Sequence, residues 1–302
     1  MSVRIEHGDY PLLEIVRKLE NQSNRVRGRL IQAELQFMGV QYHLQESRLL
    51  KIINIIVDIA PASTAKKLLF SAHYDAVKGS PGANDNASGV AVLVGLCQKL
   101  KVSGVPARIV FFDREEAWFK SPLLRLGLLG SLYYAVRTDL KDISAVFNLE
   151  FCGLGEVLGV WPIKQREREL AAVKQVEAAA KRLDIDIKWA HLPWFILSSD
   201  HLTFRLRGIS NSLTLSLLPG SQIPALEKMV SGLNWRKILF RGRTVLPQPL
   251  FHIHSNQDNS SKLSEHSLQR TLSLLIEVIK EESNRQLAEN STRKEKEQAR
   301  LF

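Results

Sequence analysis

Three short apolar runs, each followed by histidine or carboxylate side chains, restrict the fold of this chain more than any other feature. The runs are residues 68–72, 107–113 and 143–149, and they lead into His73, into Glu115 with Glu116, and into Glu150. Continuous apolar runs of this length are typical of strands buried on both faces. In open α/β sheets, sites form at the carboxyl ends of such strands. The sequence therefore predicts an α/β fold with a polar site at one edge of the sheet.

His73 and Asp75 stand at the end of the first run. Because they are only two residues apart, both side chains could not comfortably bind one metal. Asp75 is well placed instead to accept a hydrogen bond from the second ring nitrogen of His73, which would orient a metal-binding imidazole. We therefore predict that His73 is a metal ligand and that Asp75 supports it.

Asp85 lies in a stretch of glycine and small residues, 79–89, just before the apolar helix pattern 90–100. An acidic residue in that place is also a good helix cap, so the residue type alone has two explanations. The small neighbours leave room for a metal and a substrate, and they favour a functional role for Asp85.

Glu115 and Glu116 would be ordinary solvated charges on an exposed loop, but they follow a buried strand at the edge where His73 is expected. One carboxylate can hold a metal while the other accepts a proton from a water molecule whose pKa the metal lowers. Glu150 ends a third strand, and histidine together with carboxylates suits zinc. The sequence thus predicts a zinc centre with a general base beside it.

The order of motifs along the chain resembles the M28 zinc peptidases. It reads His-x-Asp, Gly-x-x-Asp-Asn-x-x-Gly, Glu-Glu with a later Gly-Ser, Asn-Leu-acid-x-x-Gly, Ser-Asp-His-x-x-Phe-x-x-x-Gly-Ile and His-x-x-x-Asp, from His73 to Asp258. No single motif is specific, but the combination is. The resemblance implies a single-domain, three-layer α/β/α sandwich with a mixed, largely parallel central sheet.

The resemblance also implies five metal ligands. Asp85 would bridge two zinc ions. His73 and Glu150 would complete one site, and Glu116 and His254 the other. The family usually has aspartate where this chain has Glu150, so the extra methylene changes the reach of that ligand. Two zinc ions are expected, and one remains an alternative if Glu150 falls short.

Further residues are assigned by the same resemblance. Glu115 would be the general base, while Asp75 and Asp258 would support the two histidine ligands. Asp200 and His201 would line the substrate side of the site. The implied reaction is that of an aminopeptidase, which hydrolyses the first peptide bond of a substrate with a free amino terminus.

One segment departs from typical aminopeptidases. The segment 117–126, between Glu116 and Gly127, is longer than usual. Read from Glu115, it opens Glu-Glu-Ala-aromatic and contains Ser-Pro, and so resembles the segment of the glutaminyl cyclases, the single-zinc branch of this fold. Trp118 and Trp194 could form an aromatic pocket for a glutamine side chain. Two features argue against a cyclase. Ile253 stands where that branch has an aromatic residue, and this chain has the Asp-Asn-x-x-Gly pattern that the branch lacks. The peptidase is favoured, with the cyclase as the first alternative and an inactive binding module on the same fold as the second.

Composition sets further expectations. The 302 residues are 45% apolar, enough to bury one α/β core, and the net charge of +10 is dispersed among acids without a nucleic-acid motif. The amino terminus has no apolar signal region, and no run of about 18 apolar residues occurs, so we expect no membrane span and a cytoplasmic protein. The two cysteines, Cys97 and Cys152, give no disulfide framework, which is consistent with a reducing compartment.

The expected organisation is one catalytic domain over residues 1–282 and a charged tail over 283–302 that would fray. Residues 219–250 form an insertion rich in basic and apolar residues, and they would be either a lid or specificity loop or a plain surface excursion. Elsewhere we expect one or two helices in 10–38, a strand pair in 41–59, a helix in 165–183, a strand in 212–218 and a closing helix in 264–282.

Overall fold

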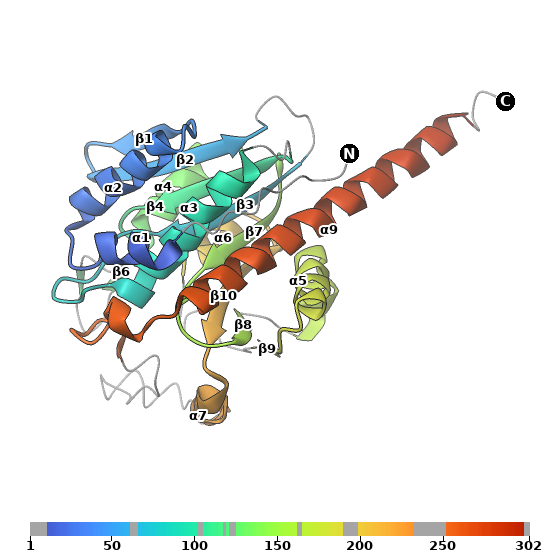
Figure 1. Ribbon diagram of the computed structural model, residues 1–302. Helices are drawn as coiled ribbons and strands as arrows, with labels where there is room; N and C mark the ends of the chain where they lie inside the picture. Colours follow the sequence, from blue (N-terminus) through green and yellow to red (C-terminus); the bar gives the residue numbers. More distant parts are fainter. Residues whose placement is uncertain are drawn as a thin grey trace.

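The apolar runs form the centre of one eight-stranded sheet in the computed structural model (Figure 1), which describes residues 11–60, 66–101, 105–116, 119–120, 125–161, 165–189, 199–231 and 252–298. In spatial order the strands are β1 (His43–Ser47), β2 (Ile52–Ile59), β4 (Ala107–Phe112), β3 (Lys67–His73), β7 (Ile143–Leu149), β10 (Ser212–Leu218), β8 (Val157–Trp161) and β9 (Ile187–Trp189). A separate two-stranded hairpin pairs β5 (Phe119–Lys120) with β6 (Arg125–Leu126).

The four middle strands β4, β3, β7 and β10 run parallel to one another, while β2 and β8 pair with them antiparallel from either side. Every residue of β3 is buried, as expected for a parallel strand covered on both faces. Because β3, β4 and β7 point the same way, their carboxyl ends lie at one edge, and the residues that follow them meet there.

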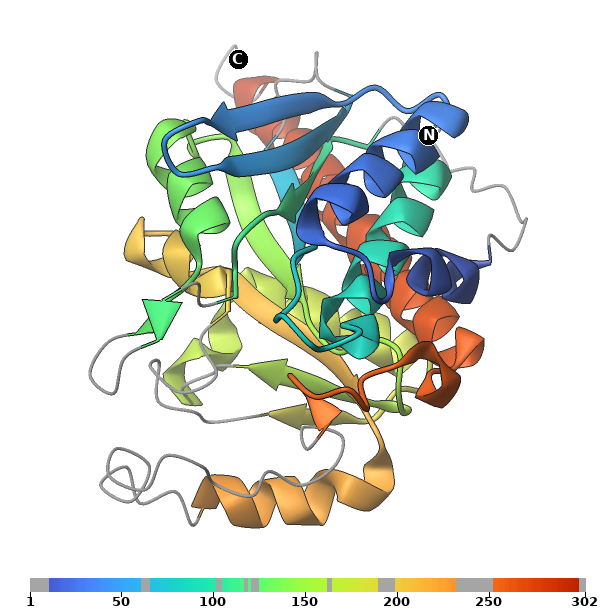
Figure 2. The same cartoon turned by 90° about the vertical axis from the view of Figure 1, so that its left-hand side faces the viewer.

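Helices cover both faces of the sheet, so the three-layer prediction is confirmed (Figure 2). One face is packed by α1 (Leu12–Leu19), α2 (Asn24–Phe37), α3 (Ser88–Leu100), α5 (Ala171–Arg182) and α9 (Glu265–Gln298). The other face is packed by α4 (Leu129–Arg137) and α6 (His201–Leu206). The remaining helical segments are η1 (Ala83–Ala87), η2 (Gln165–Glu169), η3 (Gly220–Gln222), α7 (Ile223–Ser231) and η5 (Ser260–Lys262).

Most expected elements are present, with two differences. Residues 10–38 contain two helices, 41–59 the hairpin β1–β2, and 212–218 the strand β10. The helix expected over 165–183 is divided into η2 and α5. The tail expected over 283–302 is helical as far as Gln298, because α9 continues to that residue without a break. Of the 219–250 insertion, the described part is η3 and α7, and the rest lies outside the described residues.

None of the helices in the described ranges combines the length and the apolar character that crossing a bilayer requires. The longest, α9, is 34 residues long and mostly polar.

Candidate metal centre

Five side chains from separate parts of the chain converge at the carboxyl edge of the parallel strands. His73 is the last residue of β3, and Asp85 lies in η1, which leads into α3. Glu116 and Glu150 follow β4 and β7, and His254 precedes η5. All five were predicted as ligands, and the structure brings all five together in two groups that share Asp85.

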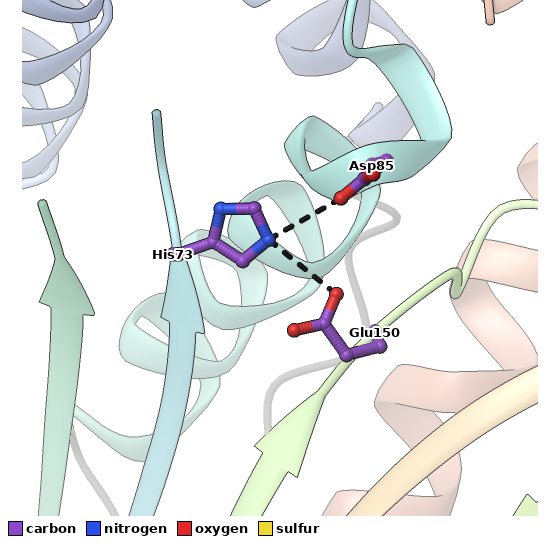
Figure 3. A group of neighbouring side chains, drawn as sticks. All are labelled: His73, Asp85 and Glu150. Carbon is purple, nitrogen blue, oxygen red and sulfur yellow. Dashed lines mark ion pairs between the residues drawn. The ribbon is translucent and has the colours of Figure 1, made fainter. Parts of the chain in front are cut away.

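The first group consists of His73, Asp85 and Glu150, whose side chains point toward one another (Figure 3). His73 Nε2 lies 3.3 Å from Asp85 Oδ1 and 3.5 Å from Glu150 Oε2. The side chains are 1%, 5% and 4% exposed. The longer side chain of Glu150 therefore does reach the group.

The second group consists of Asp85, Glu116 and His254. His254 Nε2 lies 3.2 Å from Asp85 Oδ2 and 2.7 Å from Glu116 Oε1. Asp85 thus turns one oxygen toward each group. His254 is the most open member, with its side chain 32% exposed.

These donor sets fit zinc. Around a tetrahedral zinc ion with bonds of about 2.1 Å, ligand atoms stand about 3.4 Å apart. The separations of 3.3, 3.5 and 3.2 Å are close to that edge length, and only the His254–Glu116 pair at 2.7 Å would have to open slightly. One imidazole nitrogen and two carboxylate oxygens per group leave a fourth position for water or substrate, as in catalytic zinc sites.

Asp75 contacts His73 and also the segment that carries the paired glutamates. His73 Nδ1 lies 3.3 Å from Asp75 Oδ1, which leaves Nε2 facing the ligand group. The backbone N–H groups of Glu115 and Glu116 donate to Asp75 Oδ1 and Oδ2, each at 3.0 Å. One carboxylate therefore fixes a histidine and the chain direction after β4, a second function that the two-residue spacing did not indicate.

Glu115 and Glu116 differ in their surroundings although they are neighbours in the chain. Glu116 is buried against His254, whereas Glu115 is half-buried and belongs to neither ligand group. Burial and the nearby carboxylates of Glu116 and Glu150 raise the pKa of Glu115 well above its usual value, with His73 opposing them. A carboxylate with raised proton affinity beside a ligand group is suited to accepting a proton.

Within the two ligand groups, both histidines carry positive charge and the shared Asp85 carries negative charge. Burial lowers the pKa of both rings, but carboxylates outweigh it: Glu150 and Glu115 raise the pKa of His73 well above normal, and hydrogen bonds with Asp85 and Glu116 raise that of His254 to about 9. Burial likewise works against ionised Asp85, yet hydrogen bonds from the two histidines hold its pKa far below the usual value. Asp85 is therefore an anion, ready to bind cations on both sides.

Glu150 is held by Ser199 and Asn148, which begin two of the sequence motifs but were given no role there. The Ser199 hydroxyl donates to Glu150 Oε1 at 2.5 Å, and Asn148 Nδ2 donates to Ser199 Oγ at 2.8 Å. Asn148 Oδ1 in turn accepts from the Ser71 hydroxyl at 2.9 Å. With Oε1 occupied in this way, Oε2 is the oxygen turned toward His73. A polar residue facing inward from a buried strand, such as Asn148, was the available signal.

Asp200 and His201 are placed differently from the expectation that they line a substrate surface. Both side chains are 0% exposed. Burial raises the pKa of Asp200 to about 7, against the influence of His73 and the Ser131 hydroxyl. Burial lowers the pKa of His201 to about 3, and its Nδ1 pairs with the Thr214 hydroxyl at 2.7 Å. Both side chains are therefore covered by protein, which corrects the expectation that they line a substrate surface.

Asp258 has partners other than those expected. Its carboxylate accepts from the backbone N–H groups of Asn84 at 2.8 Å and Asp85 at 3.1 Å. It therefore supports the loop of the shared ligand, which corrects the expectation that it supports His254. Trp118 and Trp194, expected to contribute to an aromatic pocket, lie outside the described residues.

Comparison with known proteins assigns the family. Residues 54–279 match peptidase family M28. Since that match spans most of the chain, the protein belongs to this family. Aminopeptidase YwaD of Bacillus subtilis is 40% identical over 90 residues, which are 28% of this chain and 17% of that protein. The chain thus matches less than a fifth of the length of this relative.

Solved structures share the fold. BSAP, a zinc aminopeptidase from Bacillus subtilis, has a TM-score of 0.55 and 24% identity, over 76% of this chain and 49% of its own. Porphyromonas gingivalis glutaminyl cyclase has a TM-score of 0.66 and 19% identity, over 90% of this chain and 97% of its own. At these identities the likeness concerns the fold alone. The family is one of peptidases, and the solved neighbours share its fold.

Proposed function

We propose that the protein is a zinc-dependent aminopeptidase that hydrolyses the amino-terminal peptide bond of its substrate. The observation that carries this proposal is the position of Asp85, which directs one oxygen into each of two adjacent ligand groups. Two complete groups, each with a histidine and a second carboxylate, are what a two-zinc centre needs. His73 and Glu150 would hold one ion, Glu116 and His254 the other, and Asp85 both.

Zinc in this centre would polarise the scissile carbonyl and lower the pKa of the attacking water. Glu115 would take the proton from that water, since its carboxylate lies close to His73, Glu116 and Glu150 and belongs to neither ligand group. The water oxygen bonds to the carbonyl carbon, the C–N bond breaks, and Glu115 returns the proton to the leaving amine. Asp75 keeps the base in place, because it binds the backbone N–H of Glu115.

Glutaminyl cyclisation is the second candidate. The long Glu-Glu-Ala-aromatic segment with Ser-Pro resembles that branch, and the solved cyclase is covered over almost its full length. In this reaction the substrate's own amine attacks the side-chain amide of an amino-terminal glutamine and ammonia leaves. Glu150 reaches His73 in the first ligand group, so that group is complete and a second zinc ion could bind there. Two zinc ions are expected for the peptidase and one for the cyclase, so this position favours the peptidase.

A paired assay separates the two reactions. The zinc-loaded protein is incubated with a panel of aminoacyl chromogenic amides and, separately, with a glutaminyl peptide, while its zinc content per chain is measured. We expect release from at least one aminoacyl amide and two zinc ions per chain. Cyclisation of the glutaminyl peptide with no release from any amide would overturn the peptidase proposal. If neither reaction occurred, a binding module would be favoured.

A further inference from the structure

A buried arginine outside the ligand set holds the loop between two of the ligands. Arg27 in α2 is 1% exposed, and it is the only buried arginine among the described residues. Its Nη1 donates to the carbonyl oxygen of Tyr74 at 3.3 Å, and Nη2 donates to those of Pro81 at 2.5 Å and Gly82 at 3.1 Å. One guanidinium thus joins the two ends of the loop 74–82.

That loop connects His73 to Asp85 and is shaped closely around the guanidinium. Gly82 has a φ of 63°, and a Cβ at this position would lie 2.7 Å from Arg27 Nη2 and 3.0 Å from the Asp85 carbonyl oxygen. Only glycine fits there without displacing one of these groups. The position of Asp85 therefore depends on a loop that is folded around the guanidinium of Arg27.

Neighbours of Arg27 contact the loop before Asp85 and the segment after His254. We call residues 20–27, the turn after α1 and the start of α2, the α1–α2 corner. Asn24 Oδ1 accepts from the Ala76 N–H at 3.2 Å. Glu20 accepts from both the N–H and the hydroxyl of Ser260 at 2.8 Å, in the segment that follows His254. The corner thus ties the loop before Asp85 to the segment after His254.

Arg27 also places a cation near the acidic centre. Burial lowers the pKa of its guanidinium, whereas Asp75, Asp258 and Asp85 raise it. A guanidinium stays charged at any physiological pH, and its planar fork can serve several carbonyls at once. A lysine would keep the charge and lose the fork, so charge and geometry can be separated by one substitution.

We propose that Arg27 is a positioning residue for the metal centre, which fixes the 74–82 loop so that Asp85 stands between the two ligand groups. Glu20 and Asn24 complete the α1–α2 corner. The inference rests on the ligand assignment of the proposed function. It assigns to a helix pair that supplies no ligand a role in setting metal affinity.

The test is the zinc affinity of the full chain, measured by competition with a chromogenic chelator. We expect Arg27→Lys to weaken zinc binding about 10–100-fold, the usual cost of losing a partner that orients ligands. Arg29→Lys changes an exposed arginine of the same helix and should bind zinc as the unchanged protein does. Visible spectra of the cobalt-loaded proteins report the ligand geometry directly, and only Arg27→Lys should alter them.

Wild-type zinc affinity and an unaltered cobalt spectrum in folded Arg27→Lys would overturn the positioning role. Circular dichroism establishes whether that variant folds. If it does not fold, Asn24→Ala removes a single hydrogen bond to the same loop, and it should weaken zinc binding by a few-fold; unchanged affinity there would overturn the role as well. Absence of zinc binding by the unchanged protein would instead reject the ligand assignment itself.

Discussion

At the scale of single residues, the site separates two adjacent glutamates by their surroundings. The Glu116 carboxylate lies 2.7 Å from His254 Nε2. The backbone N–H of Glu115 donates to Asp75, while the Glu115 side chain belongs to neither ligand group. His254 itself has a φ of 60°, a left-handed conformation that costs a non-glycine residue about 1–2 kcal/mol. Such strain persists where the surroundings enforce it, and it is often found at functional positions.

Glu115→Gln tests the division between base and ligand. The amide still hydrogen-bonds water and cannot accept its proton, so we expect turnover to fall about 10²–10⁴-fold with zinc content unchanged. Glu116→Gln is the matched comparison, and it should lose zinc together with activity because that side chain lies in a ligand group. Steady-state kinetics and metal analysis measure both; near-normal turnover of Glu115→Gln would remove it as the base.

Four of the five ligand residues stand at a fixed offset from a strand or helix pattern, whereas His254 was assigned only by the resemblance in motif order. His73 and Glu150 end or follow apolar runs, and Asp85 precedes a helix. Arg27 could not be found in this way. It acts through carbonyl groups 47 to 55 positions away, and those contacts do not depend on the side chains of the loop.

At the scale of elements, an ionic pair links the strands next to the site. Asp58 in β2 stands directly opposite Arg108 in β4, and Arg108 Nε donates to Asp58 Oδ1 at 2.8 Å and Nη2 to Oδ2 at 3.2 Å. Lys67 at the start of β3 adds a contact of 3.5 Å. Burial alone would raise the pKa of Asp58, but Arg108 and Lys67 outweigh it and the pKa is lowered.

Asp58→Asn should therefore lower stability in a pH-dependent way. A lowered pKa in the folded state means that the carboxylate stabilises the fold above its unfolded pKa of about 3.9, and that this stabilisation is lost as pH falls through the folded value. We expect a deficit of about 1–3 kcal/mol at pH 7 that narrows between pH 5 and pH 3. Urea unfolding of both proteins across this range measures it. Asp139→Asn, an exposed acid, is the control, and a deficit independent of pH would contradict the ionic explanation.

The central strands followed from the apolar runs, but β8 and β9 were not predicted and the strand order did not follow. β3 pairs with β7, and β10 inserts between β7 and β8, so the order depends on contacts between distant segments. The end of α9 was missed for a different reason. Apolar periodicity stops near residue 282, yet the residues after it are mostly strong helix formers such as glutamate, lysine, arginine and glutamine, and no glycine or proline interrupts them.

At the scale of the whole molecule, α9 packs along the domain and then projects beyond it (Figure 1). Its first half buries Leu268, Leu275 and Ile279 in the core. The described side chains from Leu287 onward are exposed, and Ser291 and Thr292 hydrogen-bond only to the preceding turn of the same helix. The two halves of this helix therefore contribute differently to stability.

Deleting residues 291–302 should leave the unfolding free energy within about 0.5 kcal/mol of the full chain, since the exposed Ser291 and Thr292 make hydrogen bonds only within the helix. Ile279→Ala, in the packed half of the same helix, should cost about 2–5 kcal/mol through the cavity it leaves. Thermal unfolding monitored by circular dichroism compares the two. A large loss on deletion would show that the projecting half has a structural partner.

The wide separation of the ligands in the sequence bears on the order of events during folding. Glu116 and His254 meet although they are 138 positions apart, and the contact from Glu20 to Ser260 spans 240. Neither ligand group found among the described residues lies within one short peptide, so zinc has little to bind until these long loops have closed at their entropic cost. Metal uptake must then follow the non-local steps of folding, which are the slow ones. A chain that has acquired its zinc is one that has already reached its final topology.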